Sequence, residues 1–322
     1  MKALKDCRVL VTPTSYGSQD PALKSDLEAV VAEVIYNTTG KPLSSNQLQE
    51  LLPGIDGMIA GLDEIDAQAL AAANDLKVVA RYGVGYNNVD LDTAREKGIV
   101  VTNTPGANAV AVAELTVALI LNMLRPIIPA VTHTKSGEWP RYKGISLDGK
   151  VVGLLGLGAI GKETAIRLSG FGCKILAYDL YPDEKFAAEH GIDLVLMDEI
   201  LPIADVLSLH LPGTSETKGI VNREFLNKMK DGAWLVNTAR GDLIDEDALV
   251  IALKEGKLKG AALDVYPAEP PSPDNPLLQM QQVITTPHMG AHADSATNAM
   301  GRMALMECLS VLKGSEPENQ VS

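Results

Sequence analysis

A glycine-rich turn between a strand and a helix constrains this chain more than any other feature. Residues 151–161 read Val-Val-Gly-Leu-Leu-Gly-Leu-Gly-Ala-Ile-Gly, so an apolar strand pattern runs directly into the spacing G-x-G-x-x-G and then into a helical pattern. Such glycines permit a tight turn, close approach of backbone N–H groups to a phosphate, and close packing of helix on strand. Asp179 closes the next apolar run, where its carboxylate can accept hydrogen bonds from a ribose. These features predict a dinucleotide site formed by Gly156, Gly158, Ala159, Ile160, Gly161 and Asp179.

The residues after Asp179 indicate which dinucleotide fits. Leu180 and Tyr181 follow it, and neither can receive the 2′-phosphate of NADP as an arginine would. The carboxylate itself would repel that phosphate, so NAD is the predicted cofactor. The alternative interpretation is that the glycines serve only a tight turn and that Asp179 is a solvated residue at a strand end.

Strand-like and helix-like patterns alternate on both sides of this turn. One series fills the first hundred residues and a second begins at Val151, which predicts parallel sheets with helices on both faces. The length of 322 residues fits two such domains. Residues 106–124 form a helical pattern that is apolar around nearly its whole circumference and must be covered at an interface. A last helix over 293–312 is expected to pack on the first domain, and residues 314–322 to form a frayed polar tail.

Composition excludes several classes of function. The chain has 28 Lys and Arg against 41 Asp and Glu, and its formal charge of −13 repels phosphate backbones and anionic membranes. We therefore expect no nucleic acid and no membrane partner. The three cysteines form no C-x-x-C pair, which fits a reducing, cytoplasmic location and excludes a disulfide framework. No residue pattern predicts a metal site.

Six further motifs follow one another along the chain, in the part between about residue 76 and residue 301. They are Arg81-Tyr-Gly-Val-Gly-Tyr-Asn-Asn-Val-Asp90, Asn103-Thr-Pro-Gly106, His210-Leu-Pro212, Asn237-Thr-Ala-Arg-Gly241, Asp264-Val-Tyr-Pro-Ala-Glu-Pro270 and Thr286-Pro-His-Met-Gly-Ala291. Together with the glycine turn, they make the sequence resemble the D-isomer specific 2-hydroxyacid dehydrogenase family, and its phosphoglycerate dehydrogenase branch most.

The resemblance implies an α/β fold with two doubly wound domains. A flavodoxin-like substrate domain would comprise residues 1–102 and 292–322, and a Rossmann NAD-binding domain, residues 103–291, would be inserted in it, with the active site in the cleft. The resemblance also implies a homodimer formed through the 106–124 helix. The implied activity is reversible hydride transfer between NAD(H) and a small 2-hydroxy or 2-oxo acid.

Three side chains are candidates for this chemistry, which needs a cation for the substrate carboxylate and a proton donor for the alkoxide. Arg240 follows the strand pattern 234–237, at the sheet edge where open α/β folds bind ligands, and its planar fork suits a carboxylate. His288 follows the strand pattern 283–286 and can act as general acid in reduction and base in oxidation. Glu269 would hydrogen-bond the ring and favour its protonated form. The alternative interpretations are a surface ion-pair arginine for Arg240, a loop histidine with satisfied hydrogen bonds for His288, and a solvated loop acid for Glu269.

Substrate and cofactor contacts are also expected. Gly83, Val84 and Gly85 would present backbone N–H groups to the substrate carboxylate, because small residues allow close approach; a simple turn is the alternative. Arg81, which opens this motif, is assigned to the substrate site with them. Asp264 could be a cap or ion-pair residue instead of a cofactor contact. The resemblance carries over, as cofactor positions, Leu211, Thr238, Ala239, Asp264 and Gly290.

The sequence leaves the substrate open. The 81–90 motif favours 3-phosphoglycerate, but Gly61-Leu62 stands where phosphoglycerate enzymes commonly carry an arginine, and Asn87 where an aspartate is usual. Glyoxylate or hydroxypyruvate is the alternative substrate. Arg141 and Lys143 would supply positive charge or lie in a solvated loop. A hypothesis of another class is an NAD(H)-sensing corepressor, since such proteins share the fold and the three catalytic side chains.

Overall fold

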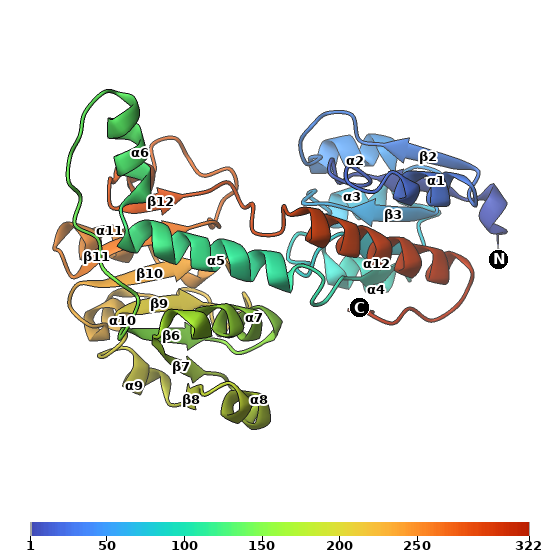
Figure 1. Cartoon of the computed structure of the whole chain (residues 1–322). Coiled ribbons are helices and arrows are strands. Elements are labelled where there is room, and N and C mark those ends of the chain that lie inside the picture. The colour runs from blue at the N-terminus through green and yellow to red at the C-terminus, as the bar shows by residue number, and fades with distance from the viewer. Residues whose placement is uncertain (1, 322) are drawn as a thin grey trace. The chain divides into compact units, whose positions relative to one another are not determined.

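A computed structural model describes residues 2–321 and divides into two compact units (Figure 1). Unit 1 comprises the residues up to Asn108 and those from Ala291 onward, and unit 2 comprises Ala109–Gly290. The first boundary lies six residues later than the predicted 102/103 because the segment after the last strand of unit 1 stays bonded to that unit. Thr104, for example, donates its backbone N–H to the carbonyl of Gly83 at 3.1 Å.

Unit 1 contains a five-stranded parallel sheet in the order β2-β1-β3-β4-β5, which is the flavodoxin-like order. Its apolar runs form strands because both faces of the sheet are covered by helices. The strands are β1 (Arg8–Val11), β2 (Glu33–Tyr36), β3 (Gly57–Ala60), β4 (Val78–Arg81) and β5 (Val100–Thr102), and the helices are η1 (Leu4–Asp6), α1 (Ala22–Glu28), α2 (Ser45–Leu51), α3 (Ala67–Ala71), α4 (Leu91–Glu96) and α12 (Asp294–Leu312).

Side-chain caps begin several of these short helices. The hydroxyl of Ser44 accepts the N–H of Gln47, whose side chain accepts the N–H of Ser44 in return, so α2 begins with a capping box. The hydroxyl of the next residue, Ser45, donates to Asp66, which caps α3. Each such cap contributes about 0.5–2 kcal/mol.

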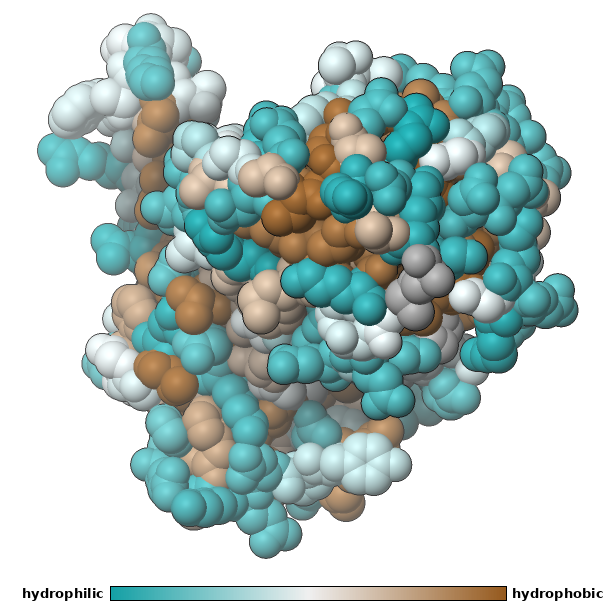
Figure 2. Space-filling model, turned by 90° about the vertical axis from the view of Figure 1, so that its right-hand side faces the viewer, coloured by the Kyte–Doolittle hydropathy of each residue, from teal (hydrophilic) through white to brown (hydrophobic). Residues whose placement is uncertain are grey.

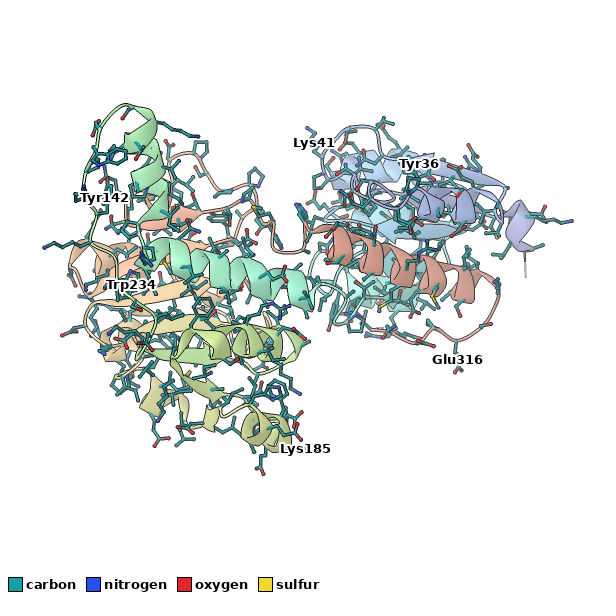
Figure 3. The ribbon with its side chains drawn as sticks, in the orientation of Figure 1. Tyr36, Lys41, Tyr142, Lys185, Trp234 and Glu316 are labelled. Atoms are coloured by element: carbon teal, nitrogen blue, oxygen red, sulfur yellow. The ribbon has the colours of Figure 1, made fainter. Side chains whose placement is uncertain are left out.

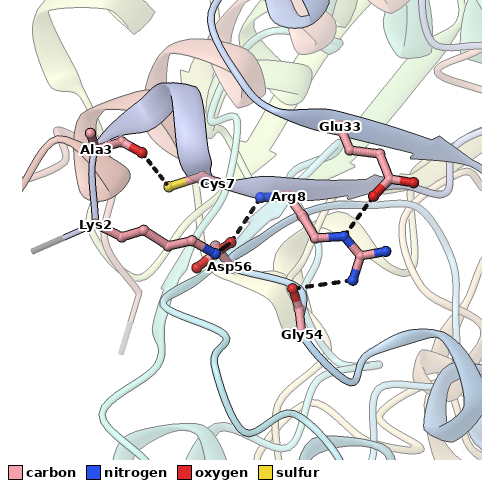
Figure 4. A network of polar contacts seen from close by, with 7 residues as sticks. All are labelled: Lys2, Ala3, Cys7, Arg8, Glu33, Gly54 and Asp56. Atoms are coloured by element: carbon pink, nitrogen blue, oxygen red, sulfur yellow. Dashed lines mark hydrogen bonds and ion pairs between the residues drawn. The ribbon is translucent and has the colours of Figure 1, made fainter.

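Asp56 ties the amino-terminal segment to the sheet (Figure 4). Its carboxylate accepts the backbone N–H of Arg8 at 2.8 Å and pairs with the Lys2 ammonium at 2.7 Å. The guanidinium of Arg8 reaches Glu33 on the neighbouring strand β2 at 2.6 Å. Exposed ion pairs of this kind contribute about 0–1 kcal/mol each, so they set the position of β1 more than they stabilise the unit.

Helix α12 completes unit 1. It packs on β3 and β4, as expected from the sequence. The prediction of a frayed tail is wrong for the described residues beyond it. The N–H of Val321 donates to the carbonyl of Val101 at 2.8 Å, and Gln320 pairs with Thr102 in an antiparallel bridge. The tail therefore covers the edge of β5, whose backbone groups would otherwise be unpaired.

Unit 2 contains a seven-stranded parallel sheet in the order β12-β11-β10-β9-β6-β7-β8, a Rossmann arrangement with β6 at the reversal of strand order. Trp234 lies on β10 (Figure 3), with the Lys259 ammonium 5.1 Å from its ring centre. The strands are β6 (Val151–Leu155), β7 (Lys174–Tyr178), β8 (Asp193–Leu194), β9 (Val206–Leu209), β10 (Ala233–Asn237), β11 (Leu258–Leu263) and β12 (Val283–Thr285), and the helices are α5 (Ala109–Leu124), α6 (Ile127–Lys135), α7 (Ala159–Leu168), η2 (Ser169–Phe171), α8 (Glu184–Glu189), α9 (Met197–Ile200), α10 (Arg223–Lys228), η3 (Gly241–Leu243), α11 (Glu246–Lys254) and η4 (Pro276–Gln279).

Helices α5 and α6 differ in how they are covered. Helix α5 packs on α7, β10 and β11 within unit 2, so most of its apolar residues are already buried there. Helix α6 has no buried residue, and the apolar side chains of Ile127, Ile128 and Val131 on it are exposed to solvent. Figure 2 shows one face of the molecule, on which brown, apolar residues lie among teal, hydrophilic ones. Among the described residues, no single helix is long and apolar enough to cross a membrane, although the bent pair α5 and α6 passes by length and composition together.

Candidate functional site

The glycine turn joins β6 to α7. Gly156 has a φ of 102°, and a Cβ on it would lie 2.6 Å from the carbonyl oxygen of His210. A Cβ on Gly161 would lie 2.2 Å from the carbonyl oxygen of Gly156, so both positions require glycine. Beside Gly158 there is open space, and this residue begins α7 without a side-chain cap. The first N–H groups of α7 are therefore available to a phosphate.

Asp179 lies at the end of β7 and holds the same turn. Its two carboxylate oxygens accept the backbone N–H groups of Leu157, at 2.6 Å, and of Tyr181, at 2.9 Å. One N–H for each oxygen leaves lone pairs for the hydroxyls of a ribose. The side chains of Leu180 and Tyr181 are exposed, and neither offers a charge to a second phosphate.

His210, at the end of β9, adds an unusual polar atom near the turn. Burial lowers the pKa of His210 to about 4, so the ring is neutral at physiological pH. Its Nε2 lies 3.0 Å from the hydroxyl oxygen of Ser208, whereas its buried Nδ1 has no hydrogen-bond partner among residues 2–321. Buried polar atoms without a partner are rare in proteins. This atom, the open space and the carboxylate of Asp179 fit a bound dinucleotide.

The His288–Glu269 pair is the main chemical feature of unit 2. The Nδ1 atom of His288 lies 2.6 Å from Oε2 of Glu269, and the other carboxylate oxygen accepts the N–H of Tyr266 at 3.0 Å. Burial would raise the pKa of Glu269, but the hydrogen bond and charge of His288, the Tyr266 N–H and the charge of Arg240 outweigh it. The pKa of Glu269 is therefore lowered, and the carboxylate stays ionised beside the ring.

Asp264, at the end of β11, holds the loop that carries His288. Its buried carboxylate accepts the hydroxyl of Thr286 at 2.5 Å and the N–H groups of Met289 and Gly290 at 2.9 and 2.8 Å. These residues flank His288, whose φ of 49° is in the left-handed region. A non-glycine residue there costs of order 1–3 kcal/mol, which three hydrogen bonds to one carboxylate offset. The contacts of Asp264 favour this positioning role over the expected cofactor contact.

Arg240 follows β10 in a loop that packs tightly on its neighbour. A Cβ on Gly241 would lie 1.9 Å from the carbonyl carbon of Tyr266, so only glycine allows this approach. The Asn237 side chain closes the loop by donating to the carbonyl of Arg240 at 2.7 Å. Burial lowers the pKa of Arg240, and the negative charge of Glu269 opposes this effect. Because guanidinium is so strong a base, it remains a cation.

Unit 2 thus places Arg240, Glu269 and His288 after three neighbouring strands, β10, β11 and β12. Sequence reasoning predicted these three residues as the candidate site but gave no role to Thr286 and Met289, since hydrogen bonds to a distant carboxylate leave no local pattern. The remaining predicted cofactor positions lie at the start of α7 and at the ends of β9, β10 and β12, namely Ala159, Ile160, Leu211, Thr238, Ala239 and Gly290.

The predicted substrate residues belong to unit 1. Arg81 is only 2% exposed, and its guanidinium donates to the carbonyls of Ala60, Gly61 and Gly85. It therefore supports the backbone of the segment 83–85, which we call the substrate loop. Within the described chain, the backbone N–H groups of this loop donate to no acceptor.

The other charged and apolar candidates differ in exposure. Leu62, in the loop after β3, is half exposed, and the exposed Arg141 and Lys143 lie in the segment after α6. In the same segment, Tyr142 (Figure 3) contacts His133 of α6.

Comparison with known proteins identifies the family. Residues 117–290 match the family model described as D-isomer specific 2-hydroxyacid dehydrogenase, NAD binding domain. This chain belongs to that family. Unit 2 is accordingly its NAD-binding domain, and the expected cofactor, NAD, is confirmed.

Proteins of similar sequence bear the names of several different enzymes. D-3-phosphoglycerate dehydrogenase of Archaeoglobus fulgidus is 40% identical over 319 residues, covering 98% of this chain and 59% of the relative. Glyoxylate reductase of Thermofilum pendens is 40% identical, covering 88% and 86%. Hydroxypyruvate reductase of Thermotoga maritima is 39% identical, covering 88% and 93%. The chain therefore spans about three fifths of the length of the first of these relatives.

Solved structures have a similar fold over nearly the whole length of the chain. The TT0316 protein of Thermus thermophilus is 38% identical with a TM-score of 0.87, covering 98% of this chain and 100% of that one. D-lactate dehydrogenase of Aquifex aeolicus, solved with NAD and lactic acid, is 29% identical with a TM-score of 0.85, covering 97% and 98%. The predicted two-domain α/β fold is thus confirmed.

Proposed function

We propose that the protein is an NAD-dependent D-2-hydroxyacid dehydrogenase, which transfers hydride reversibly between NAD(H) and a small 2-hydroxy or 2-oxo acid. The observation that carries this proposal is the 2.6 Å contact between His288 and Glu269, whose charge also acts on the partly buried Arg240, in an NAD-binding domain. Bound NADH supplies the hydride, and the residues of this chain supply the proton and hold the substrate.

His288 is the proposed proton donor in reduction. Because its Nδ1 faces Glu269, its Nε2 is the nitrogen that gives a proton to the carbonyl oxygen of the substrate as an alkoxide forms there. The ionised Glu269 stabilises the imidazolium before transfer. Arg240 binds the substrate carboxylate and polarises the carbonyl through its fixed fork of N–H donors. In oxidation, neutral His288 takes the hydroxyl proton.

The N–H groups of Gly83, Val84 and Gly85 are the proposed second site for the substrate carboxylate, with Arg81 supporting their loop. For NAD, we propose the turn and strand-end residues already described: Gly156, Gly158, Ala159, Ile160, Gly161, Asp179, Leu211, Thr238, Ala239, Asp264 and Gly290, of which Asp264 acts through the loop of His288.

Two substrate classes are consistent with the relatives. The names of the longer relatives favour 3-phosphoglycerate, and those of the two reductases favour glyoxylate or hydroxypyruvate. Leu62 lends weight to the second class, since a half-exposed apolar side chain in the loop after β3 offers no charge to a phosphate.

We also propose a cytoplasmic homodimer. Helix α5, which the sequence assigned to the interface, is largely buried in its own unit, but it leads into the exposed apolar residues of α6. A second copy could cover this surface. The three cysteines are all free thiols, in agreement with a reducing compartment.

The test is oxidation of NADH with a panel of 2-oxo acids that includes glyoxylate, hydroxypyruvate and 3-phosphohydroxypyruvate. We expect turnover with at least one of them and a loss of about 10²- to 10⁴-fold in His288→Ala, with NADH affinity retained. The exposed His190 provides a matched control, and His190→Ala should be unaffected. Tight NADH binding without turnover of any acid would favour the sensor hypothesis instead.

A further inference from the structure

The carbonyl groups of the substrate loop are tied to residues outside it. The N–H of Thr104 donates to the carbonyl of Gly83 at 3.1 Å, and the side-chain amide of Asn103 donates to the carbonyl of Val84 at 2.8 Å. A peptide unit is planar, so a fixed carbonyl also fixes the N–H of the next residue. The support at Gly83 thus aims the N–H of Val84, and the support at Val84 aims the N–H of Gly85.

Asn103 is held in turn by residues 315–321, which we call the terminal segment. The backbone N–H of Asn103 donates to the carbonyl of Asn319 at 3.1 Å. Next to this bond, Gln320 and Val321 pair with the edge strand β5. Asn103 is 9% exposed, so its position depends on this segment more than on solvent.

Glu307 on α12 anchors the terminal segment. Its carboxylate accepts the side-chain amide of Asn319 at 2.7 Å and the backbone N–H of Glu318 at 3.1 Å. The residue is only 4% exposed, and a buried carboxylate is costly unless hydrogen bonds compensate it. Both of these bonds come from the terminal segment, so Glu307 and the segment fix each other.

We propose that Glu307 and the terminal segment are positioning elements for substrate binding. Glu307 holds Asn319, Asn319 holds Asn103, and Asn103 holds the Val84 carbonyl, so that the substrate loop presents its N–H groups in a fixed direction to the carboxylate. This inference rests on the proposed function, which assigns the loop to the substrate. The NAD-binding turn and His288 belong to unit 2, whereas this relay lies wholly in unit 1.

The first test separates substrate affinity from the other steps. In Glu307→Gln, the amide nitrogen must face one of the two donors, so one buried hydrogen bond is lost. We expect KM for the best 2-oxo acid to rise about three- to tenfold, with kcat within about twofold of the wild type. The dissociation constant of NADH and the pH profile should not change. A chain ending at Gly314 should show a larger rise in KM.

A matched control is available on the same helix. The hydroxyl of Ser310 donates to the carbonyl of Glu316 at 3.3 Å, which ties α12 to the terminal segment outside the relay. Ser310→Ala should leave KM unchanged. If the shortened chain does not fold, Glu307→Gln and this control decide the question. A lower melting temperature with unchanged KM in Glu307→Gln, or a loss in kcat alone, would overturn the proposal in favour of a purely structural role.

Hydrogen exchange gives a readout that does not depend on catalysis. The backbone amides of Asn103 and Thr104, which donate to the carbonyls of Asn319 and Gly83, should exchange faster in Glu307→Gln than in the wild type, and at the wild-type rate in Ser310→Ala. If no 2-oxo acid is turned over, the proposed function fails, but the relay is still measured. Faster exchange in the terminal segment without any change at Asn103 and Thr104 would show that the relay does not exist.

Discussion

Replacement of Glu269 by glutamine would separate the charge of the His288–Glu269 pair from its geometry. Glutamine has the same length and can still accept a hydrogen bond from Nδ1, but it carries no charge. Hydrogen bonds to charged groups contribute about 1.5–3 kcal/mol, against about 1 kcal/mol for neutral ones. The difference is about 0.5–2 kcal/mol. The two side chains are 34% and 31% exposed, so solvent weakens the pair, and we take a loss in the lower half of this range, about 1 kcal/mol.

That loss corresponds to about a fivefold change in rate. Reduction needs a proton donor, and the charge of Glu269 stabilises the charged imidazolium from which the proton leaves. We therefore expect kcat/KM for reduction to fall about fivefold in Glu269→Gln. Oxidation needs the neutral ring, so its kcat/KM should not fall when the charge is removed.

The assay is kcat/KM against pH in both directions for the wild type and Glu269→Gln. Glu246→Gln is a matched control, because this acid accepts a hydrogen bond from Asn275 and lies at the start of α11. Losses of equal size in both directions at every pH would refute the charge argument and leave Glu269 with the orientation of the ring alone.

Three further predictions concern other residues. Arg240→Lys keeps the charge but not the planar fork, so kcat/KM should fall about 10- to 100-fold while NADH affinity, followed by fluorescence, stays constant. Gly241→Ala places a Cβ against Tyr266 and should lower the free energy of unfolding in urea by about 1–3 kcal/mol or more, whereas Gly170→Ala, in open space, should not. Burial lowers the pKa of His210 to about 4 from 6.5, so the unfolded chain binds this proton first, and stability should fall as pH drops between these values. The loss is up to about 3 kcal/mol and should be smaller in His210→Gln; equal losses in both proteins would contradict it.

Strands could be predicted well because short apolar runs between turn residues are a strong local signal. The predicted strand patterns 234–237 and 283–286 differ by one residue each from β10 (Ala233–Asn237) and β12 (Val283–Thr285), and β6 begins at Val151 as expected. Elements whose ends depend on distant contacts could not be placed as well. Helix α5 begins at Ala109 rather than Gly106, and β8 was missed because it has only two residues, held by pairing to β7.

In the candidate site, too, some features could be predicted from local sequence and others could not. Arg240, Glu269 and His288 could be named from motifs that follow strands, and their pairing in unit 2 agrees with that reasoning. The tail after α12 looked frayed because it is polar and short, yet Glu307 and Asn319 hold it through contacts that no window of sequence reveals. The left-handed backbone of His288 was equally invisible, since it depends on the carboxylate of Asp264.

The discontinuity of unit 1 has a consequence for how the protein is made. Helix α12 covers β3 and β4, and Gly57 fits against Cys308 and Leu312. During translation, the whole of unit 2 is synthesised before this helix. The apolar face of the first sheet therefore stays exposed to solvent while unit 2 folds. Ribosome-bound nascent chains that end before residue 294 should therefore aggregate or bind general chaperones through this exposed apolar face. Chaperone binding should stop once α12 has been synthesised and covers the sheet.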